Sequence, residues 1–353
     1  MDTEREKSRR KRRRRQTAGA VLAVMLLLLA AVLAGIVIWR NIKVSGRRNP
    51  AQTDKIVPLE SGTGAQTEPV TETEPPTETE APTEPPAELR ITPEELYSAH
   101  AILVRTKTGE VLLDKESTEQ IYPASMTKIM TALVALEQIP DLGVSIRLDE
   151  SMFEELYLAE ASMAGFLPGE EVTALDLLYG VMLPSGAECC TGIAEYVAGS
   201  EEGFVELMNE KAAELGMTGT HFVNGSGLSD PEHYSTVADI AKLLEYALRN
   251  DTFREIASSP LHSTEPTELH PEGITLYSTL FGYMNEEIRD SGLIAGGKTG
   301  YTDEAGLCLA SFADIQDEQF ILVTAEAQGS HETEPFHILD AYGVYKNLEI
   351  ARP

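Results

Sequence analysis

The sequence predicts an α+β fold, in which an antiparallel sheet is built from both ends of one domain, is covered by helices, and lies beside an all-helical subdomain. Short apolar runs typical of strands occur near residue 100 and again between residues 293 and 327. Between them, from residue 124 to about residue 250, the apolar residues follow a mainly helical spacing. Strands on either side of a helical region can form one sheet only when the first and last parts of the domain lie side by side.

A transmembrane helix is predicted at residues 18–39, a run of 22 uncharged and mostly apolar residues. Such a run is long enough to cross ~30 Å of hydrocarbon. The basic tail of residues 1–17 is expected to stay in the cytoplasm, which places the rest of the chain on the extracytoplasmic face. A cleaved signal peptide is the alternative, but its apolar core spans only about 7–15 residues. We therefore expect an uncleaved signal anchor in a single-pass protein of the cell membrane.

Residues 40–88 form a linker rich in Thr, Glu and Pro, whose second half is an imperfect Thr-Glu-Pro repeat. Proline opposes helix and sheet, and the like charges keep the chain extended at up to ~3.1 Å per residue. We expect this linker to hold a folded domain, residues 89–353, away from the membrane.

Composition excludes some classes of partner. The net charge is −29, although residues 1–50 carry 13 Lys and Arg against three Asp and Glu. So acidic an outer region argues against nucleic acid as a partner. The three cysteines, Cys189, Cys190 and Cys308, are too few for a disulfide framework and are expected to be buried structural residues. We expect neither a metal nor a cofactor.

The elements of the folded domain follow from local pattern. Ala101–Arg105 and Val111–Asp114 flank a turn at Thr106–Glu110 and predict a β-hairpin. Leu175–Leu183 is too apolar for a surface helix and is predicted to cross a core and to end at Pro184. Two amphipathic helices are predicted at residues 203–215 and 236–248, the second capped by Ser235 and Thr236.

Residues 259–274 contain three prolines and are expected to form a connecting loop. Three strands are then predicted at residues 293–301, 306–312 and 320–327, forming an antiparallel meander. A closing helix is expected at residues 336–348.

A possible nucleophile lies at the start of the central helix. Apolar residues recur at one-face helical spacing, at Met126, Ile129, Met130 and Leu133. Ser125 therefore lies at or just inside a helix start, and Lys128 lies one turn away on the same side. A serine hydroxyl becomes a good nucleophile when a base takes its proton, and a lysine can be that base if its pKa is lowered.

Two further stretches accompany this Ser-x-x-Lys pattern. Ser185-Gly186-Ala187 follows the apolar helix, and Lys298-Thr299-Gly300 lies between strand-like segments. Alone, the first is an ordinary helix cap and the second an ordinary turn. Lys107-Thr108-Gly109 repeats the second triplet, but it precedes Ser125 within the hairpin turn, so we assign it a structural role.

Taken together, these stretches make residues 94–349 resemble the serine-type D-alanyl-D-alanine carboxypeptidases, the low-molecular-mass penicillin-binding proteins of peptidase family S11. Three further segments support the resemblance, namely Thr220–Leu228, His233–Asp239 and Ala305–Cys308. The resemblance implies the family's fold, which agrees with the one predicted above. Because the sequence ends at Pro353, we expect no additional C-terminal β-domain of the kind that many family members carry.

The resemblance also implies roles. Ser125 would attack the carbonyl of a D-Ala-D-Ala terminus of a peptidoglycan stem peptide, or a β-lactam, with Lys128 as the base. Ser185 would relay a proton to the leaving amine, Lys298 would supply positive charge, and Thr299 would bind the substrate carboxylate. Gly300 would leave the strand open for the extended substrate. The backbone N–H groups of Ser125 and Tyr301 would stabilise the oxyanion.

One position departs from the family. The middle triplet is usually Ser-x-Asn, and Ala187 stands in place of the Asn. A missing amide predicts slower or retuned activity, and it keeps a non-catalytic wall-binding protein as an alternative. A serine β-lactamase is the other alternative, for which Glu154, Glu155 or Glu170 would have to supply a deacylation base.

Overall fold

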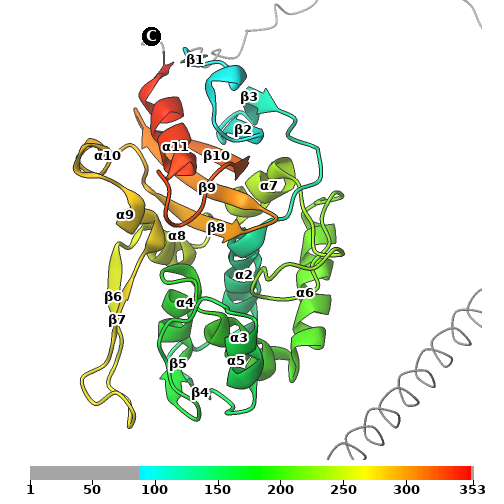
Figure 1. Ribbon diagram of the computed structural model, residues 1–353, viewed down its shortest axis with the longest axis vertical. Helices are drawn as coiled ribbons and strands as arrows, with labels where there is room; N and C mark the ends of the chain where they lie inside the picture. The colour runs from blue at the N-terminus through cyan, green and yellow to red at the C-terminus, as the bar shows by residue number, and fades with distance from the viewer. Residues whose placement is uncertain (1–86, 351–353) are drawn as a thin grey trace, which may run out of the picture. The chain divides into compact units, whose positions relative to one another are not determined.

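The computed structural model describes residues 87–350, and the description below concerns that part of the chain (Figure 1). The predicted cytoplasmic tail, the anchor at residues 18–39 and nearly all of the linker lie outside the described residues. Within residues 87–350, no helix is both long and apolar enough to cross a membrane.

A five-stranded antiparallel sheet is assembled from both ends of the described chain, as predicted. Its strand order is β3-β2-β10-β9-β8. The strands are β2 His100–Arg105, β3 Glu110–Lys115, β8 Gly296–Thr302, β9 Gly306–Ile315 and β10 Glu318–Ala327. Strand β10 pairs with β2, which joins the late strands to the early hairpin. The predicted hairpin and the predicted meander are both confirmed.

Both faces of the sheet are buried, and alternate residues of one strand belong to different cores. On β10, Ile321 and Val323 face the core shared with the helical region, whereas Phe320 and Leu322 face the core under the closing helix. This two-residue period is that of a strand. Figure 1 shows the closing helix in front of the sheet and the helical subdomain extending away from it.

The helical region lies between the two groups of strands. Its helices are η2 Ala124–Thr127, α2 Lys128–Gln138, α3 Met152–Leu158, α4 Ala174–Met182, α5 Ala187–Ala198, α6 Glu201–Glu214, α7 Val237–Ala247 and α8 Asp251–Ser258. The predicted core helix is α4, which is buried along most of its length and ends before Pro184. The closing helix is α11 Phe336–Lys346, and α9 Thr279–Tyr283 and α10 Glu286–Ser291 precede β8.

Three pairs of short strands and one 3-10 helix differ from the expectation or were missed. The segment predicted as a connecting loop at residues 259–274 includes one short strand, β6 Leu261–Ser263, which forms a β-hairpin with β7 Thr275–Tyr277 just after the segment. Two histidine–carboxylate pairs, His262 with Asp176 and His270 with Glu170, fasten this hairpin to the helical subdomain. Two further strand pairs, and the 3-10 helix η1, were not anticipated. They are β1 Ala87–Leu89 with β11 Leu348–Ile350, β4 Ser145–Arg147 with β5 Glu171–Thr173, and η1 Pro93–Glu95.

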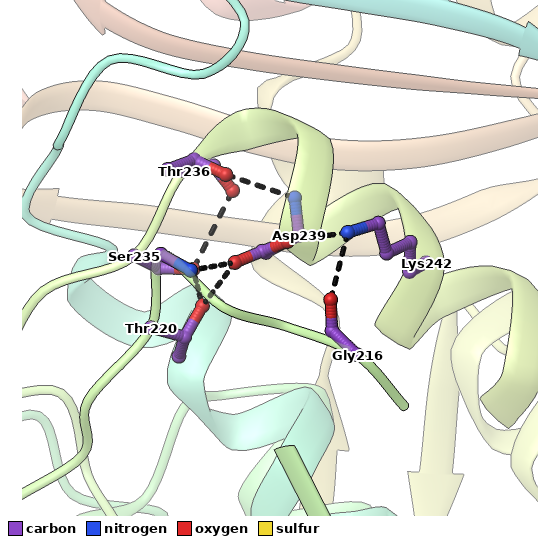
Figure 2. Close-up of polar contacts among 7 residues, drawn as sticks. Gly216, Thr220, Ser235, Thr236, Asp239 and Lys242 are labelled. Atoms are coloured by element: carbon purple, nitrogen blue, oxygen red, sulfur yellow. Dashed lines mark hydrogen bonds and ion pairs between the residues drawn. The ribbon is translucent and has the colours of Figure 1, made fainter. Parts of the chain in front are cut away.

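A polar cluster fixes the start of α7 (Figure 2). The Asp239 backbone N–H donates to Thr236 Oγ1 over 3.0 Å, which confirms Thr236 as the predicted cap. The Asp239 carboxylate in turn accepts from Thr220 Oγ1 over 3.0 Å and from Lys242 Nζ over 2.8 Å. Lys242 also donates to the Gly216 carbonyl. The cluster therefore ties the turn after α6 to α7, and between them lies a segment that reaches the candidate site.

Candidate active site

Ser125 and Lys128 share one turn, as the sequence predicted, since Ser125 lies in η2 and Lys128 begins α2. The Lys128 Nζ lies 3.1 Å from Ser125 Oγ and donates to the Ser226 carbonyl over 2.5 Å. Lys128 is only 2% exposed. Burial lowers the pKa of its ammonium, against the opposing effect of Cys190 and Glu188 nearby. A buried amine with a lowered pKa can act as a base towards the Ser125 hydroxyl.

Ser185 and Lys298 complete a chain of polar contacts to the same hydroxyl. Ser185 Oγ donates to Ser125 Oγ over 2.9 Å, and Lys298 Nζ donates to Ser185 Oγ over 3.1 Å. Burial, together with the charge of Lys128, lowers the pKa of Lys298 well below its usual value. Ser185 has a φ of 70°, a left-handed conformation that is strained for a residue with a side chain. The three stretches singled out in the sequence therefore meet at one point.

Thr299, Gly300 and Tyr301 lie on β8 beside this point. Thr299 Oγ1 lies 2.7 Å from Thr279 Oγ1. Gly300 also has a role in packing. A Cβ there would lie 3.1 Å from the Ser125 backbone nitrogen and 3.2 Å from the Pro123 carbonyl oxygen. The glycine therefore lets the nucleophile's turn pack directly on β8.

Two cavities meet at Ser125. The larger, of about 520 Å³, we call the cleft, and its walls include Lys128, Ala187 and Ser226. The smaller, of about 50 Å³, we call the small pocket, and its walls include Ser185 and Thr299. Four residues line both cavities, namely Ser125, Ser162, Tyr301 and His331.

The loop between α6 and α7 supplies groups that sequence reasoning did not assign. The Ser226 carbonyl orients Lys128, and the next residue, Gly227, has a φ of +80°. A Cβ on Gly227 would lie 1.9 Å from the Ala124 carbonyl oxygen, so only glycine fits against the nucleophile's turn. The sequence does contain a pattern that could have indicated this contact, since two glycines flank Ser226 within the segment Thr220–Leu228.

His233 supports the same turn from behind. The Val223 backbone N–H donates to His233 Nδ1 over 3.1 Å, so the ring carries its proton on Nε2, which donates to Thr127 Oγ1 over 2.8 Å. Burial lowers the pKa of His233 to about 4. The imidazole is therefore neutral at physiological pH and holds Thr127 as a structural partner.

Ala187 lines the cleft, and its backbone N–H donates to the Ser162 carbonyl over 2.8 Å. The neighbouring Glu188 is fully buried and accepts from the backbone N–H groups of Ala164 and Gly165, over 2.7 and 2.9 Å. Burial raises the pKa of Glu188. Glu188 thus fastens the loop that carries Ser162 to α5.

The remaining sequence candidates lie elsewhere. Glu170 is buried and accepts from Thr267 and His270 of the β6–β7 hairpin, which makes it a structural residue. Glu154 and Glu155 lie on α3 and line neither cavity. Lys107-Thr108-Gly109 forms the turn between β2 and β3. The three cysteines are free and buried. Within residues 87–350, no group of three or more His, Cys, Asp or Glu side chains could hold a metal ion.

Comparisons with known proteins agree with this geometry. Residues 87–329 match the family model described as D-alanyl-D-alanine carboxypeptidase, Peptidase S11. The chain is 37% identical over 236 residues to the D-alanyl-D-alanine carboxypeptidase DacF of Bacillus subtilis, covering 66% of this chain and 58% of that protein. It is 34% identical to DacC of Escherichia coli, covering 64% of this chain and 56% of that protein.

Among solved structures, the Streptomyces K15 DD-transpeptidase matches with a TM-score of 0.65 at 26% identity. That match covers 73% of this chain and 98% of the other. The chain therefore spans nearly all of the K15 structure but less than three fifths of DacF and DacC.

Proposed function

The chain belongs to the D-alanyl-D-alanine carboxypeptidase family, peptidase S11, and on that premise we propose that it removes the terminal D-alanine from peptidoglycan stem peptides. One observation carries the proposal. The polar chain runs from Lys128 through Ser125 and Ser185 to Lys298, and each group in it lies within 3.1 Å of the next. It thus joins a base, a nucleophile and a proton relay, an arrangement that suits acyl transfer without a metal or a cofactor.

Acylation begins when Ser125 Oγ attacks the carbonyl carbon of the penultimate D-alanine. Lys128 takes the hydroxyl proton as the Oγ–C bond forms. The negative charge on the carbonyl oxygen is stabilised by the backbone N–H groups of Ser125 and Tyr301. The C–N bond then breaks, and the leaving amine receives a proton through Ser185. Thr299 faces the terminal carboxylate of the substrate, and Lys298 lies behind it, where it donates to Ser185 Oγ and to the Thr299 carbonyl.

In deacylation Lys128 acts as the base again, this time towards water. A water molecule in the place of the departed D-alanine loses a proton to Lys128 and attacks the ester carbonyl, which frees the shortened peptide and restores Ser125. A β-lactam acylates Ser125 by the same attack. The β-lactam adduct persists, because its ring-opened leaving group stays attached to the acyl-enzyme.

We further propose that the protein is anchored in the cell membrane through residues 18–39, with its N-terminus cytoplasmic and the catalytic domain on the extracytoplasmic face. The basic tail before an apolar run of 22 residues supports this orientation. External protease should remove the folded domain from cells whose outer envelope is opened, while an N-terminal tag stays protected. Recovery of a mature soluble form that begins after Trp39 would contradict the anchor.

The activity is tested by incubating the protein with a peptide that ends in D-Ala-D-Ala and measuring free D-alanine. We expect release by the native chain and none above background by Ser125→Ala. The control is Ser263→Ala, which changes an exposed serine of strand β6 that lines neither cavity. Equal release by the native chain and Ser125→Ala would refute the proposed nucleophile.

A further inference from the structure

Several polar residues that line the small pocket have no role in the mechanism above. Beyond Ser125, Ser185 and Thr299, it is lined by Tyr283, His331 and His337. Within the described residues that line it, there is no lysine or arginine side chain. The terminal carboxylate of a substrate must nevertheless lie on this side of Ser125, where the leaving residue sits.

We propose that His331, held by Tyr283, and His337 complete the site that recognises the terminal carboxylate of the leaving residue, facing the hydroxyl of Thr299. The proposal rests on the carboxypeptidase activity proposed above and deepens it. In this proposal, the imidazoles of His331 and His337 and the phenol of Tyr283 select a small leaving residue that has a free carboxylate.

His331 is held in one orientation by its neighbours. The Tyr283 hydroxyl lies 2.6 Å from His331 Nδ1, and the Tyr301 ring packs edge-on against the imidazole at 4.6 Å between centroids. Burial raises the pKa of Tyr283, so its hydroxyl keeps its proton and can donate to Nδ1. A neutral His331 then carries its proton on Nε2. That nitrogen has no hydrogen-bond partner among residues 87–350, which leaves an N–H donor for a ligand.

His337 provides an independent sign that a polar ligand belongs here. It is 1% exposed, it lines the small pocket, and its Nδ1 has no hydrogen-bond partner within the described part of the chain. A buried polar atom without a partner is unfavourable, so native proteins nearly always satisfy such atoms with protein, water or ligand. The His337 ring also packs edge-on against Tyr283 at 5.8 Å. The phenol therefore contacts both imidazoles.

The opposite wall supplies hydroxyls. Thr279 Oγ1 and Thr299 Oγ1 lie 2.7 Å apart, and the Lys298 ammonium is bonded to the Thr299 carbonyl. A carboxylate placed between this wall and the imidazoles meets donors on two sides. The small pocket, at about 50 Å³ against about 520 Å³ for the cleft, is the tighter of the two, which favours a leaving residue with a small side chain. D-alanine meets both conditions.

The test compares two substrates that differ only in the group being recognised. One is a diacetyl-L-Lys-D-Ala-D-Ala peptide, and the other is its C-terminal carboxamide. The measured quantity is kcat/KM for formation of the shortened peptide. We expect His331→Ala to lower this value for the free acid by about 10-fold to 100-fold, the effect of one hydrogen bond to a charged group. The amide should change by less than about 3-fold, because it lacks the charge.

Two further variants separate recognition from structure. His331→Gln keeps an N–H donor at similar reach and should recover part of the activity on the acid. Tyr283→Phe removes the group that orients His331 and should show a smaller loss confined to the acid. His270→Ala is the matched control, because His270 binds Glu170 on the β6–β7 hairpin and lines neither cavity. We expect its ratio of acid to amide activity to equal that of the native chain.

An equal loss on both substrates, or an unchanged ratio in His331→Ala, overturns the inference. In either case penicillin labelling of Ser125 and D-alanine release by the native chain would leave the proposed function intact. Absence of both labelling and release in the native chain would overturn the function and the inference together.

Discussion

The two cavities that meet at Ser125 differ in size and in chemistry. The cleft is about 520 Å³ and is walled largely by loop residues, among them Glu160, Ser229 and Asp303. The small pocket is about 50 Å³ and is walled by hydroxyls and imidazoles. Ser125 is therefore exposed to two cavities of different size and chemistry. Under the proposed function, the acyl group would lie in the cleft and the leaving residue in the small pocket.

The two buried lysines are divided in the same way. Lys128 lines the cleft and contacts Ser125 directly, whereas Lys298 reaches Ser125 only through Ser185. Burial lowers the pKa of both. The contacts predict that Lys128 serves every acylation, and that Lys298 serves the proton relay through Ser185.

The strongest test of this division is Lys128→Ala. Loss of a general base slows reaction by about 100-fold or more. We expect acylation by penicillin and by a D-Ala-D-Ala peptide to slow to a similar degree, because the base acts before the leaving group departs. The measurement is the rate of adduct formation, with Lys242→Ala as the control, since Lys242 binds Asp239 away from both cavities. A slower acylation by the peptide alone, with penicillin acylation unchanged, would contradict these separate roles of the two lysines.

The loss of folding stability at acid pH tests both regions, because each contains a buried neutral imidazole. Burial lowers the pKa of His233, behind the nucleophile's turn, and of His337, in the small pocket, from 6.5 to about 4. Between those pH values the unfolded chain binds more protons than the folded one. Stability is therefore present above pH 6.5 and is lost as the pH falls towards 4, by on the order of 3 kcal/mol for each imidazole.

Denaturant unfolding at pH 7, 5 and 4 measures this loss. His337→Phe should lose less stability on acidification than the native chain, and His233→Phe should behave similarly. If both variants lost as much stability as the native chain, the two imidazoles would not be neutral in the folded state.

Gly300→Ala tests the boundary between the cavities. The added methyl would lie 3.1 to 3.2 Å from atoms of Pro123, Ala124 and Ser125, so the nucleophile's turn must shift by a few tenths of an ångström. We expect acylation to slow by about 10-fold and stability to fall by about 1–3 kcal/mol, the usual effect of overpacking. Unchanged rates with an unchanged melting temperature would show that the turn is not seated on β8 as described.

The smallest effect is expected from Ala187→Asn on the wall of the cleft. Ala187 lines a cavity with room for a larger side chain, and Lys128 is already oriented by the Ser226 carbonyl. We expect penicillin acylation to quicken by at most about 10-fold, with a stability change of less than about 1 kcal/mol. Slower acylation in a stably folded variant would instead show that the cleft positions substrate without an amide at this place.

Sequence patterns were sufficient for elements with a long hydrophobic period. The buried α4 helix and the β8–β9–β10 meander were predicted close to their observed bounds because their residues repeat a helical or strand spacing. The three-residue strands β1, β6 and β11 are too short to show a period. Their pairing depends on partners that the fold brings together.

The site residues were predictable where reactive side chains lie close together in the sequence, as Ser125 and Lys128 do within one helical turn. It was not predictable where a contact comes from the backbone, as with the Ser226 carbonyl, or joins segments far apart in the sequence, as with Tyr283 of α9 and His331. Gly300 illustrates a third case. The sequence singled out the residue, but its contact with the nucleophile's turn becomes visible only when both segments are placed.

The acyl-enzyme is the central claim, and one measurement tests it most directly. The protein is incubated with a labelled penicillin, digested, and the labelled peptide is located by mass. The account predicts a single adduct on the peptide that contains Ser125, absent from Ser125→Ala and formed slowly by Lys128→Ala. A label on another residue, or labelling of Ser125→Ala at the native rate, would contradict it.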